Sequence, residues 1–144
     1  MQISDILRVK GRQVTTVSES GTIESVVRLL AEKRVGAVVV EDRWSKLAGI
    51  FSERDLVQAL AKRGVAIMAL PVRELMTTQV ITCVDEDRVE TMLARMTQNR
   101  IRHLPVLQDG KLAGIVSIGD LVHVRLDEKE LEAGVLLDIA RMRG

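Results

Sequence analysis

Aromatic residues are almost absent from this 144-residue sequence, which has one Trp, one Phe and no Tyr. Proteins that bind single-stranded nucleic acid usually stack bases on aromatic side chains, so this scarcity argues against that class. Net charge is also nearly absent, because 21 basic residues stand against 20 acidic ones and leave a formal charge of +1. Without a basic excess, the chain has no general attraction to nucleic acid or to an anionic membrane. We therefore expect no nucleic-acid partner and no membrane partner.

Cysteine and long apolar runs are scarce as well. The single cysteine, Cys83, cannot form an intramolecular disulfide, which fits a reducing compartment. Its apolar, strand-like surroundings predict a buried and unreactive thiol. The first residues carry an acid at Asp5 and no long apolar stretch, unlike a signal peptide. No apolar run reaches the ~18–20 residues of a membrane span, so the sequence predicts a soluble, cytoplasmic protein.

Motifs for catalysis and for metal binding are missing too. The two histidines, His103 and His123, lie far from Cys83 and show no spacing typical of metal ligands. The sequence contains no G-x-S-x-G elbow and no glycine-rich loop followed by Lys-Ser or Lys-Thr. We expect no catalytic residue, no metal site and no catalytic cofactor, hence a protein that is not an enzyme.

An internal repeat is the main feature that the sequence does contain. Residues 47–57, LAGIFSERDLV, return as residues 112–122, LAGIVSIGDLV, with eight of eleven positions identical. The upstream parts also match, at an offset one residue larger, so the two copies differ by one residue in the intervening turn. Even the lead-in repeats, since residues 3–7 resemble residues 72–76. A repeat this clear has to be taken as two copies of one structural unit.

Each copy predicts the order strand, helix, strand, strand, helix. Apolar residues recur at i, i+3, i+4 and i+7 from Ile23 in one copy and from Val89 in the other, which indicates amphipathic helices. Asp87 and Glu90 have the spacing of a capping box, and Pro71 is placed to open a short helix through Met76. The predicted strands cover residues 14–17, 36–40 and 47–52 in the first copy and 80–84, 104–107 and 112–117 in the second. The closing helices are predicted over residues 53–62 and 118–126.

The chain divides into three parts on this reading. Residues 1–66 form the first repeat with its lead-in helix, residues 67–126 form the second repeat, and residues 127–144 form a C-terminal helical tail. Acidic residues precede arginines in the tail, an order that suits the helix dipole. Four of its residues form an apolar stripe: Leu131, Val135, Leu136 and Ile139. Either this stripe packs on the chain's own core or a partner chain covers it.

Three runs, GIFSERD at 49–55, GIVSIGD at 114–120 and NRIRHLPV at 99–106, resemble the cystathionine-β-synthase (CBS) domain. Two in tandem resemble a CBS pair, or Bateman module, over residues 3–126, with no enzyme or transporter domain attached. The resemblance implies an α/β (α+β) fold with two βαββα repeats packed sheet to sheet about a pseudo-twofold axis, plus a C-terminal helix. It also implies a disc-shaped homodimer and two clefts that commonly hold AMP, ADP, ATP, NAD or S-adenosylmethionine.

The Ser-x-x-Asp elements have two interpretations. Ser52 with Asp55, and Ser117 with Asp120, have the spacing of a capping box, which needs no ligand. A carboxylate at such a strand-to-helix corner can also accept hydrogen bonds from the hydroxyls of a ribose, and the helix start favours a nearby phosphate. The resemblance favours the ribose role for both aspartates, and the two roles are compatible.

Arg102 and His103 are the candidate phosphate ligands. Related family members carry an adjacent basic pair there, often as His-Arg, and the swapped order leaves open which residue reaches the cleft. The alternative is a solvated pair at a strand edge. The first copy has Gly36 and Ala37 at these positions, so the two clefts are chemically unequal. Either one cleft is poor in phosphate ligands, or Arg102 and His103 serve both clefts across the pseudo-axis. Arg54 either adds charge to the first cleft or is a solvated charge at a helix start.

Aliphatic side chains and backbone groups are expected to hold the adenine; the candidates are Thr15, Ile50, Thr78 and Ile115. Together these features predict a non-catalytic regulatory module that binds an adenosine-containing nucleotide and senses energy or redox state for an unknown target protein. AMP or ADP ranks first, then ATP or NAD(H), and S-adenosylmethionine last, because its sulfonium gains nothing from basic residues. The alternative is a dimerisation scaffold with vacant clefts.

Overall fold

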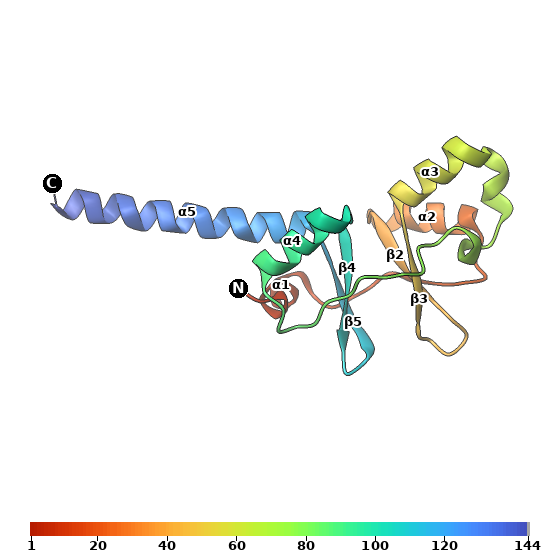
Figure 1. The fold of residues 1–144 in the computed structure, drawn as a ribbon, viewed down its shortest axis with the longest axis horizontal. Coiled ribbons are helices and arrows are strands. Elements are labelled where there is room, and N and C mark those ends of the chain that lie inside the picture. Colours follow the sequence, from red (N-terminus) through yellow and green to blue (C-terminus); the bar gives the residue numbers. More distant parts are fainter. Residues whose placement is uncertain (144) are drawn as a thin grey trace.

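Two small β-sheets lie side by side in the computed structural model, which describes residues 1–143, and one long helix projects away from them (Figure 1). The first half contains α1 (Ile3–Lys10), β1 (Thr16–Ser18), α2 (Ile23–Lys33), β2 (Ala37–Glu41), β3 (Leu47–Ser52), α3 (Glu53–Arg63) and the 3-10 helix η1 (Val65–Ala69). The second half contains the 3-10 helix η2 (Val72–Glu74), α4 (Val89–Asn99), β4 (His103–Gln108), β5 (Lys111–Ser117) and α5 (Ile118–Arg143).

The two sheets repeat one pattern, as the sequence predicts. β1 pairs in parallel with β2, and β2 pairs antiparallel with β3. The second copy has the antiparallel pair β4–β5. Each hairpin carries a register shift at the same place in the repeat, between Val40 and Glu41 in the first and between Val106 and Leu107 in the second. The repeated sequence therefore produces the same bent hairpin twice.

The strand predicted over residues 80–84 is wrong in its extent. Only Cys83 pairs with β4, where its amide donates to the carbonyl of Pro105 (3.0 Å) and its carbonyl accepts from the amide of Leu107 (2.9 Å). The next amide, that of Val84, donates instead to the carboxylate of Asp87 at 2.8 Å. Because this local bond takes the amide away from the sheet, the third strand of the second copy is reduced to a single bridge.

The predicted capping box of Asp87 and Glu90 is also wrong. α4 follows Arg88, and within residues 1–143 no side chain caps its first turn. The Asp87 carboxylate is used by the preceding loop, and the Glu90 carboxylate accepts a hydrogen bond from Nε of Arg88 at 2.8 Å. Pro71 does precede a helix, but the helix is the short η2, which ends before Met76.

The N-terminal lead-in pairs with the second copy rather than with the first. The amide of Ile3 donates to the carbonyl of Asp87 at 2.9 Å, and the amide of Val89 donates to the carbonyl of Met1 at 3.0 Å. These bonds attach α1 to the start of α4. The side chains of Ile3 and Leu7 lie in the same apolar cluster as the strands of the second copy.

The linker between the copies makes the equivalent bonds to the first copy. The amide of Val72 donates to the carbonyl of Gly21 at 2.8 Å, and the amide of Ile23 donates to the carbonyl of Leu70 at 2.9 Å. Val72 lies in the apolar cluster of the first copy. The two lead-ins are therefore exchanged between the copies about a pseudo-twofold axis. The division of the chain near residues 66 and 126 remains a proposal, since packing crosses both boundaries.

A glycine in each copy admits the lead-in of the other. A Cβ atom on Gly49 would lie 2.7 Å from both Sδ of Met76 and the carbonyl oxygen of Thr77. A Cβ atom on the equivalent Gly114 would lie 2.9 Å from Cδ2 of Leu7. Met76 and Leu7 are matching residues of the two lead-ins. The glycine of the LAGI run is thus required by close packing on both sides of the pseudo-axis.

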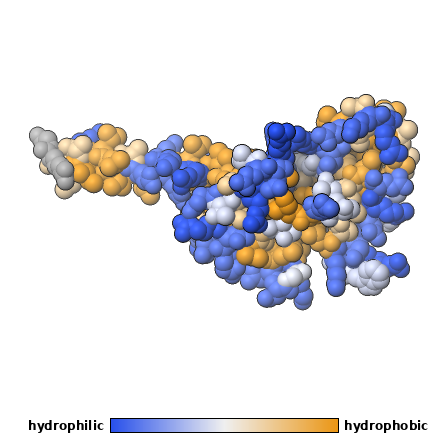
Figure 2. Space-filling model, viewed as in Figure 1, coloured by the Kyte–Doolittle hydropathy of each residue, from blue (hydrophilic) through white to orange (hydrophobic). Residues whose placement is uncertain are grey.

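The closing helix of the second copy is longer than predicted. α5 starts at Ile118 as expected but continues as one helix to Arg143, so the tail is not a separate element. Leu121 is buried, whereas Leu131 and Leu136 are 71% and 67% exposed, and Val135 and Ile139 are exposed too. Figure 2 shows apolar surface along the projecting helix. Packing of the stripe on the chain's own core is therefore excluded in this structure.

A search of residues 1–143 for membrane spans identifies no helix with the required length and apolar content.

Candidate functional site

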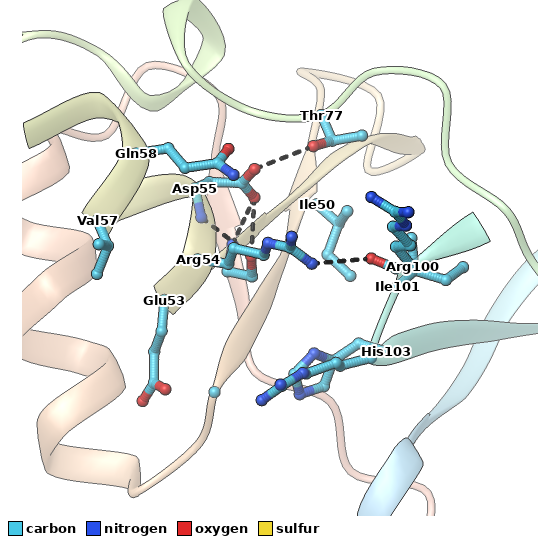
Figure 3. A pocket seen from close by; sticks show the side chains of 13 residues that line it. Ile50, Glu53, Arg54, Asp55, Val57, Gln58, Thr77, Arg100, Ile101 and His103 are labelled. Atoms are coloured by element: carbon cyan, nitrogen blue, oxygen red, sulfur yellow. Dashed lines mark hydrogen bonds between the residues drawn. The ribbon is translucent and has the colours of Figure 1, made fainter. Parts of the chain in front are cut away.

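A cavity of about 750 Å³ lies where the β3–α3 corner of the first copy faces the start of β4 in the second (Figure 3). Its volume falls in the range of small-molecule sites, roughly 300–1,000 Å³. The lining residues come from both copies: Gly36, Ile50, Ser52, Glu53, Arg54, Asp55, Val57, Gln58, Thr77, Arg100, Ile101, Arg102 and His103. A ligand here would touch both copies at once.

The corner of the cavity is the capping box predicted for α3. Oδ2 of Asp55 accepts from the amide of Ser52 at 2.9 Å and from its hydroxyl at 3.0 Å, and the amide of Asp55 donates to the Ser52 hydroxyl at 3.3 Å. Oδ1 of Asp55 accepts only a longer bond, 3.3 Å, from the hydroxyl of Thr77. One carboxylate oxygen therefore holds the helix start, and the other faces the cavity.

Thr77 belongs to this site although sequence reasoning selected its neighbour Thr78. Thr77 exchanges two backbone hydrogen bonds with Ile50, of 2.9 and 3.0 Å, beside the cavity. The signal was present in the repeat: Met76 matches Leu7 of the other lead-in, and its packing on Gly49 brings the following residue to the corner. Ile50, a candidate for the adenine contact, also lines the cavity.

Three guanidinium groups surround the cavity, and one was missed. Nη1 of Arg54 reaches across the cavity, as Figure 3 shows, and donates to the carbonyl of Arg100 at 3.1 Å. Arg100 ends α4 in the left-handed region, with φ of 53°, and its backbone places the side chain at the rim. Arg102 follows two residues later. With the carboxylates of Glu53 and Asp55, the lining carries an excess of positive charge.

His103 lies against the backbone of the first copy. A Cβ atom on Gly36 would come within 3.2 Å of both Cε1 and Nε2 of the imidazole. Burial lowers the pKa of His103 below its ordinary value of 6.5, and the nearby charge of Lys10 lowers it further. The imidazole is therefore mainly neutral at pH 7. Both Arg102 and His103 line the cavity, so the swapped order of the pair does not keep either residue away.

The second Ser-x-x-Asp corner shares two of the internal bonds of the first but has a different neighbour. Oδ2 of Asp120 accepts from the amide of Ser117 at 2.8 Å, and the amide of Asp120 donates to the Ser117 hydroxyl at 3.2 Å. Nζ of Lys10, at the end of α1, lies 2.6 Å from Oδ2 of Asp120 and 3.0 Å from the carbonyl of Ile115. Burial alone would raise the pKa of Asp120, but the bonds from Lys10 and Ser117 outweigh it and lower that pKa.

Six of the eleven predicted ligand residues thus meet at one cavity. They are Ile50, Ser52, Arg54, Asp55, Arg102 and His103. Among the described residues, Ser117, Asp120 and Ile115 lie together at the other corner, outside this lining. The carbonyl of Thr15 accepts from the amide of Val39 at 3.0 Å beside the first sheet. Thr78 is exposed and lies outside the lining of the cavity as described.

A second hollow of about 480 Å³ separates the tips of the two hairpins. Its lining includes Leu47, Leu107, Trp44 and Lys111. The guanidinium of Arg43 lies 4.7 Å from the centre of the Trp44 ring, a cation–π contact at an exposed position. The sequence analysis assigned no function to this region. The hollow lies at the hairpin tips, away from the Ser-x-x-Asp corners.

Comparison with known proteins matches the CBS domain family model to residues 3–62 and 72–127. The CBS-domain containing protein ATU1752 from Agrobacterium tumefaciens is 41% identical, with a TM-score of 0.84 over 86% of this chain and 92% of that chain. The CBS domain protein PAE2072 from Pyrobaculum aerophilum, solved in complex with AMP, is 31% identical, with a TM-score of 0.74 over 83% and 89%. The CBS domain pair of protein MJ0100, solved in complex with 5′-methylthioadenosine and S-adenosyl-L-methionine, is 25% identical, with a TM-score of 0.76 over 86% and 98%.

Proposed function

This chain belongs to the CBS domain family, and on that premise we propose that it is a non-catalytic regulatory module that binds an adenosine-containing nucleotide between its two repeats. The proposed site is the cavity at the Asp55 corner. The known ligands of two structural neighbours, AMP in one and S-adenosylmethionine with methylthioadenosine in the other, share an adenosine group. That shared group is the part of the ligand on which the proposal rests.

The observation that carries the proposal is the divided use of the Asp55 carboxylate. Its Oδ2 is taken by Ser52, whereas its Oδ1 faces the cavity beside the hydroxyl of Thr77. An ionised carboxylate accepts hydrogen bonds without donating any, so it suits the paired hydroxyls of a ribose. Ile50 offers an aliphatic contact close to that position, where an adenine ring can pack.

The cations of the cavity support the ranking of ligands. The side chains of Arg54, Arg100 and Arg102 can each present a planar fork to phosphate oxygens. Arg54 comes from the first copy and the other two come from the second, so a phosphate would connect both copies. We therefore rank AMP and ADP first, then ATP and NAD(H), and S-adenosylmethionine last. The neutral His103 can donate one further hydrogen bond.

The test is a thermal-shift screen of the purified protein with AMP, ADP, ATP, NAD⁺, NADH, S-adenosylmethionine and GTP. A ligand at 100 times its Kd stabilises the fold by about 2.7 kcal/mol, which is readily measured. Asp55→Ala should abolish the shift. Asp120→Ala is the matched control, because it removes an equivalent capping carboxylate outside the cavity. A shift that survives Asp55→Ala would contradict the proposed site.

The alternative function, a dimerisation scaffold with vacant clefts, makes the opposite prediction. It holds if none of the seven compounds changes the unfolding midpoint of protein shown to be ligand-free. GTP separates the adenosine proposal from general nucleotide binding, because it keeps the ribose and the phosphates and changes only the base. An equal shift with GTP would therefore contradict the adenosine preference while leaving the phosphate site intact.

Regulation is the second part of the proposal. A nucleotide that contacts both copies can shift the module from one arrangement of the copies to another only if it binds the two arrangements with different affinities. We propose that this change reports energy or redox state to a target protein in the cytoplasm, where the free Cys83 thiol is stable. Small-angle scattering curves that superimpose with and without saturating nucleotide would contradict this part alone.

We also propose a homodimer, with the projecting part of α5 as its contact. Leu131 and Val135 are exposed there, and a helix of this kind gains stability chiefly by packing its apolar face. Glu132 lies early in this part and Arg141 lies late, so two antiparallel copies bring opposite charges together. Light scattering should give a dimer for the full chain and a monomer for L131E/V135E. Val65→Glu, at an exposed apolar residue on η1, is the control.

A further inference from the structure

Lys10 occupies the second Ser-x-x-Asp corner in the way that a ligand would. Its ammonium lies 2.6 Å from Oδ2 of Asp120 and 3.0 Å from the carbonyl of Ile115. These are the carboxylate and the strand end that correspond, by the repeat, to Asp55 and Ile50 of the proposed site. Both side chains of the pair are partly covered, with 35% of Lys10 and 26% of Asp120 exposed.

The contact is non-local, and within residues 1–143 it has no counterpart at the first corner. Lys10 ends α1, the lead-in that pairs with the second copy, so the exchange of lead-ins carries it to Asp120. At the first corner the equivalent lead-in supplies Thr77, a neutral hydroxyl at 3.3 Å from Asp55. A charge-assisted hydrogen bond of 2.6 Å is stronger than a neutral one of 3.3 Å. The two corners therefore differ in how firmly the chain's own side chain holds the carboxylate.

The second corner has fewer cations than the first. Gly119 stands at the repeat position of Arg54, and Gly36 and Ala37 stand at those of Arg102 and His103, whereas Arg34 matches Arg100 and keeps its charge. Lys10 is thus the main positive charge directly bound at this corner, and it is already paired with Asp120. A nucleotide that entered here would have to displace the ammonium and would find few partners for its phosphates.

We propose that Lys10 is an internal plug that closes the second corner and restricts the module to one nucleotide per chain, at the Asp55 cavity. This inference rests on the proposed function, because it uses the same ribose-binding role for an aspartate at a Ser-x-x-Asp corner. Lys10 is therefore the residue that determines which of two similar corners accepts the adenosine group. Its removal frees the Asp120 carboxylate and the carbonyl of Ile115.

The test uses adenosine as the probe, because it carries the ribose and the base without phosphates, so the unequal cations of the two corners do not affect the count. Equilibrium dialysis at saturating adenosine should give one bound molecule per chain for the wild type and two for Lys10→Ala. Adding Asp120→Ala to Lys10→Ala should return the number to one, as should adding Asp55→Ala instead. Arg8→Ala is the control on the same helix, since its side chain is 75% exposed and pairs only with Asp5 among the described residues; it should still give one.

The outcomes separate the two proposals. Two adenosines per wild-type chain, or one per Lys10→Ala chain, would overturn the plug and leave the nucleotide site standing. No bound adenosine in either protein would overturn the plug, and it would overturn the nucleotide site as well if AMP also leaves the unfolding midpoint unchanged. Lys10→Arg keeps a cation at the corner, and binding of a second adenosine to that variant would also contradict the plug.

Discussion

The imidazole of His103 lies over Gly36, so closely that a Cβ atom on residue 36 would be 3.2 Å from its Nε2. Gly36 in the first copy corresponds by the repeat to Arg102 in the second, and His103 directly follows Arg102. The absence of a side chain in one copy therefore makes room for the side chain of the other. The difference between the two copies is part of how the cavity is built.

This packing makes the stability of the fold depend on pH through His103. Burial, then the charge of Lys10, holds the pKa of His103 below its ordinary value of 6.5 in the folded chain. As the pH falls through 6.5, the unfolded chain takes up a proton that the folded chain does not, so the free energy of unfolding decreases. The decrease stops once the folded imidazole is itself protonated. Urea unfolding between pH 7.5 and 5.5 should show a smaller decrease for His103→Gln, and equal decreases would contradict the prediction.

The glycines of the LAGI runs should not tolerate alanine. Gly49→Ala forces a methyl group to 2.7 Å from the backbone carbonyl of Thr77, and Gly114→Ala forces one to 2.9 Å from the flexible end of Leu7. Overpacking of this kind costs about 1–3 kcal/mol, and the cost should be larger at Gly49 because a backbone atom cannot move aside easily. Gly134→Ala, with open space around it in α5, is the control and should be stabilising by up to ~1 kcal/mol. Chemical denaturation measures all three.

The exchange of lead-ins predicts that an N-terminal substitution weakens the second copy. Leu7 is 1% exposed and lies in the cluster that contains Leu104 and Val116. Leu7→Ala should therefore lower the free energy of unfolding by about 2–5 kcal/mol. Val9→Ala, two residues away on the same helix and 92% exposed, should change it by less than ~0.5 kcal/mol. Similar values for the two variants in urea unfolding would contradict the exchanged packing.

The thiol of Cys83 should be inert in the folded protein. Burial raises its pKa to about 12, with a further contribution from Asp87, and the thiolate is the form that reacts. Iodoacetamide at pH 8 should leave the native protein unlabelled and should label it rapidly in concentrated urea. Mass spectrometry after timed quenching measures both rates. Fast labelling without urea would mean that the strand pairing at Cys83 opens readily.

The sequence predicted what is local or repeated, and it missed what depends on distant contacts. Ser52 and Asp55 are three residues apart, so their capping geometry follows from spacing alone. The placement of Lys10 at Asp120 joins residues 110 positions apart. It depends on which copy α1 packs against, which the repeat does not specify. Thr77 and Arg100 were missed for the same reason, because each reaches the cavity through the packing of a neighbouring element.

The prediction of a strand over residues 80–84 failed for a local reason. Its apolar residues are typical of a strand, but the amide of Val84 donates to the carboxylate of Asp87 and not to the neighbouring strand. This hydrogen bond lies within four residues, and strand propensity taken over a longer window does not detect it. The length of α5 was also underestimated. The sequence has no proline after Leu126, and the helix continues through Gly134.

The exchanged lead-ins also set an order of events during synthesis. α1 leaves the ribosome first, yet the core that receives Ile3 and Leu7 includes Leu121. At a synthesis rate of roughly 5–20 residues per second, the first helix waits several seconds for its partners. The first copy in turn needs Val72 from beyond its own last helix. Such long-range closure slows folding. The core of the second copy therefore forms only after Leu121 has been made, whereas the core of the first copy is complete once residue 76 is available.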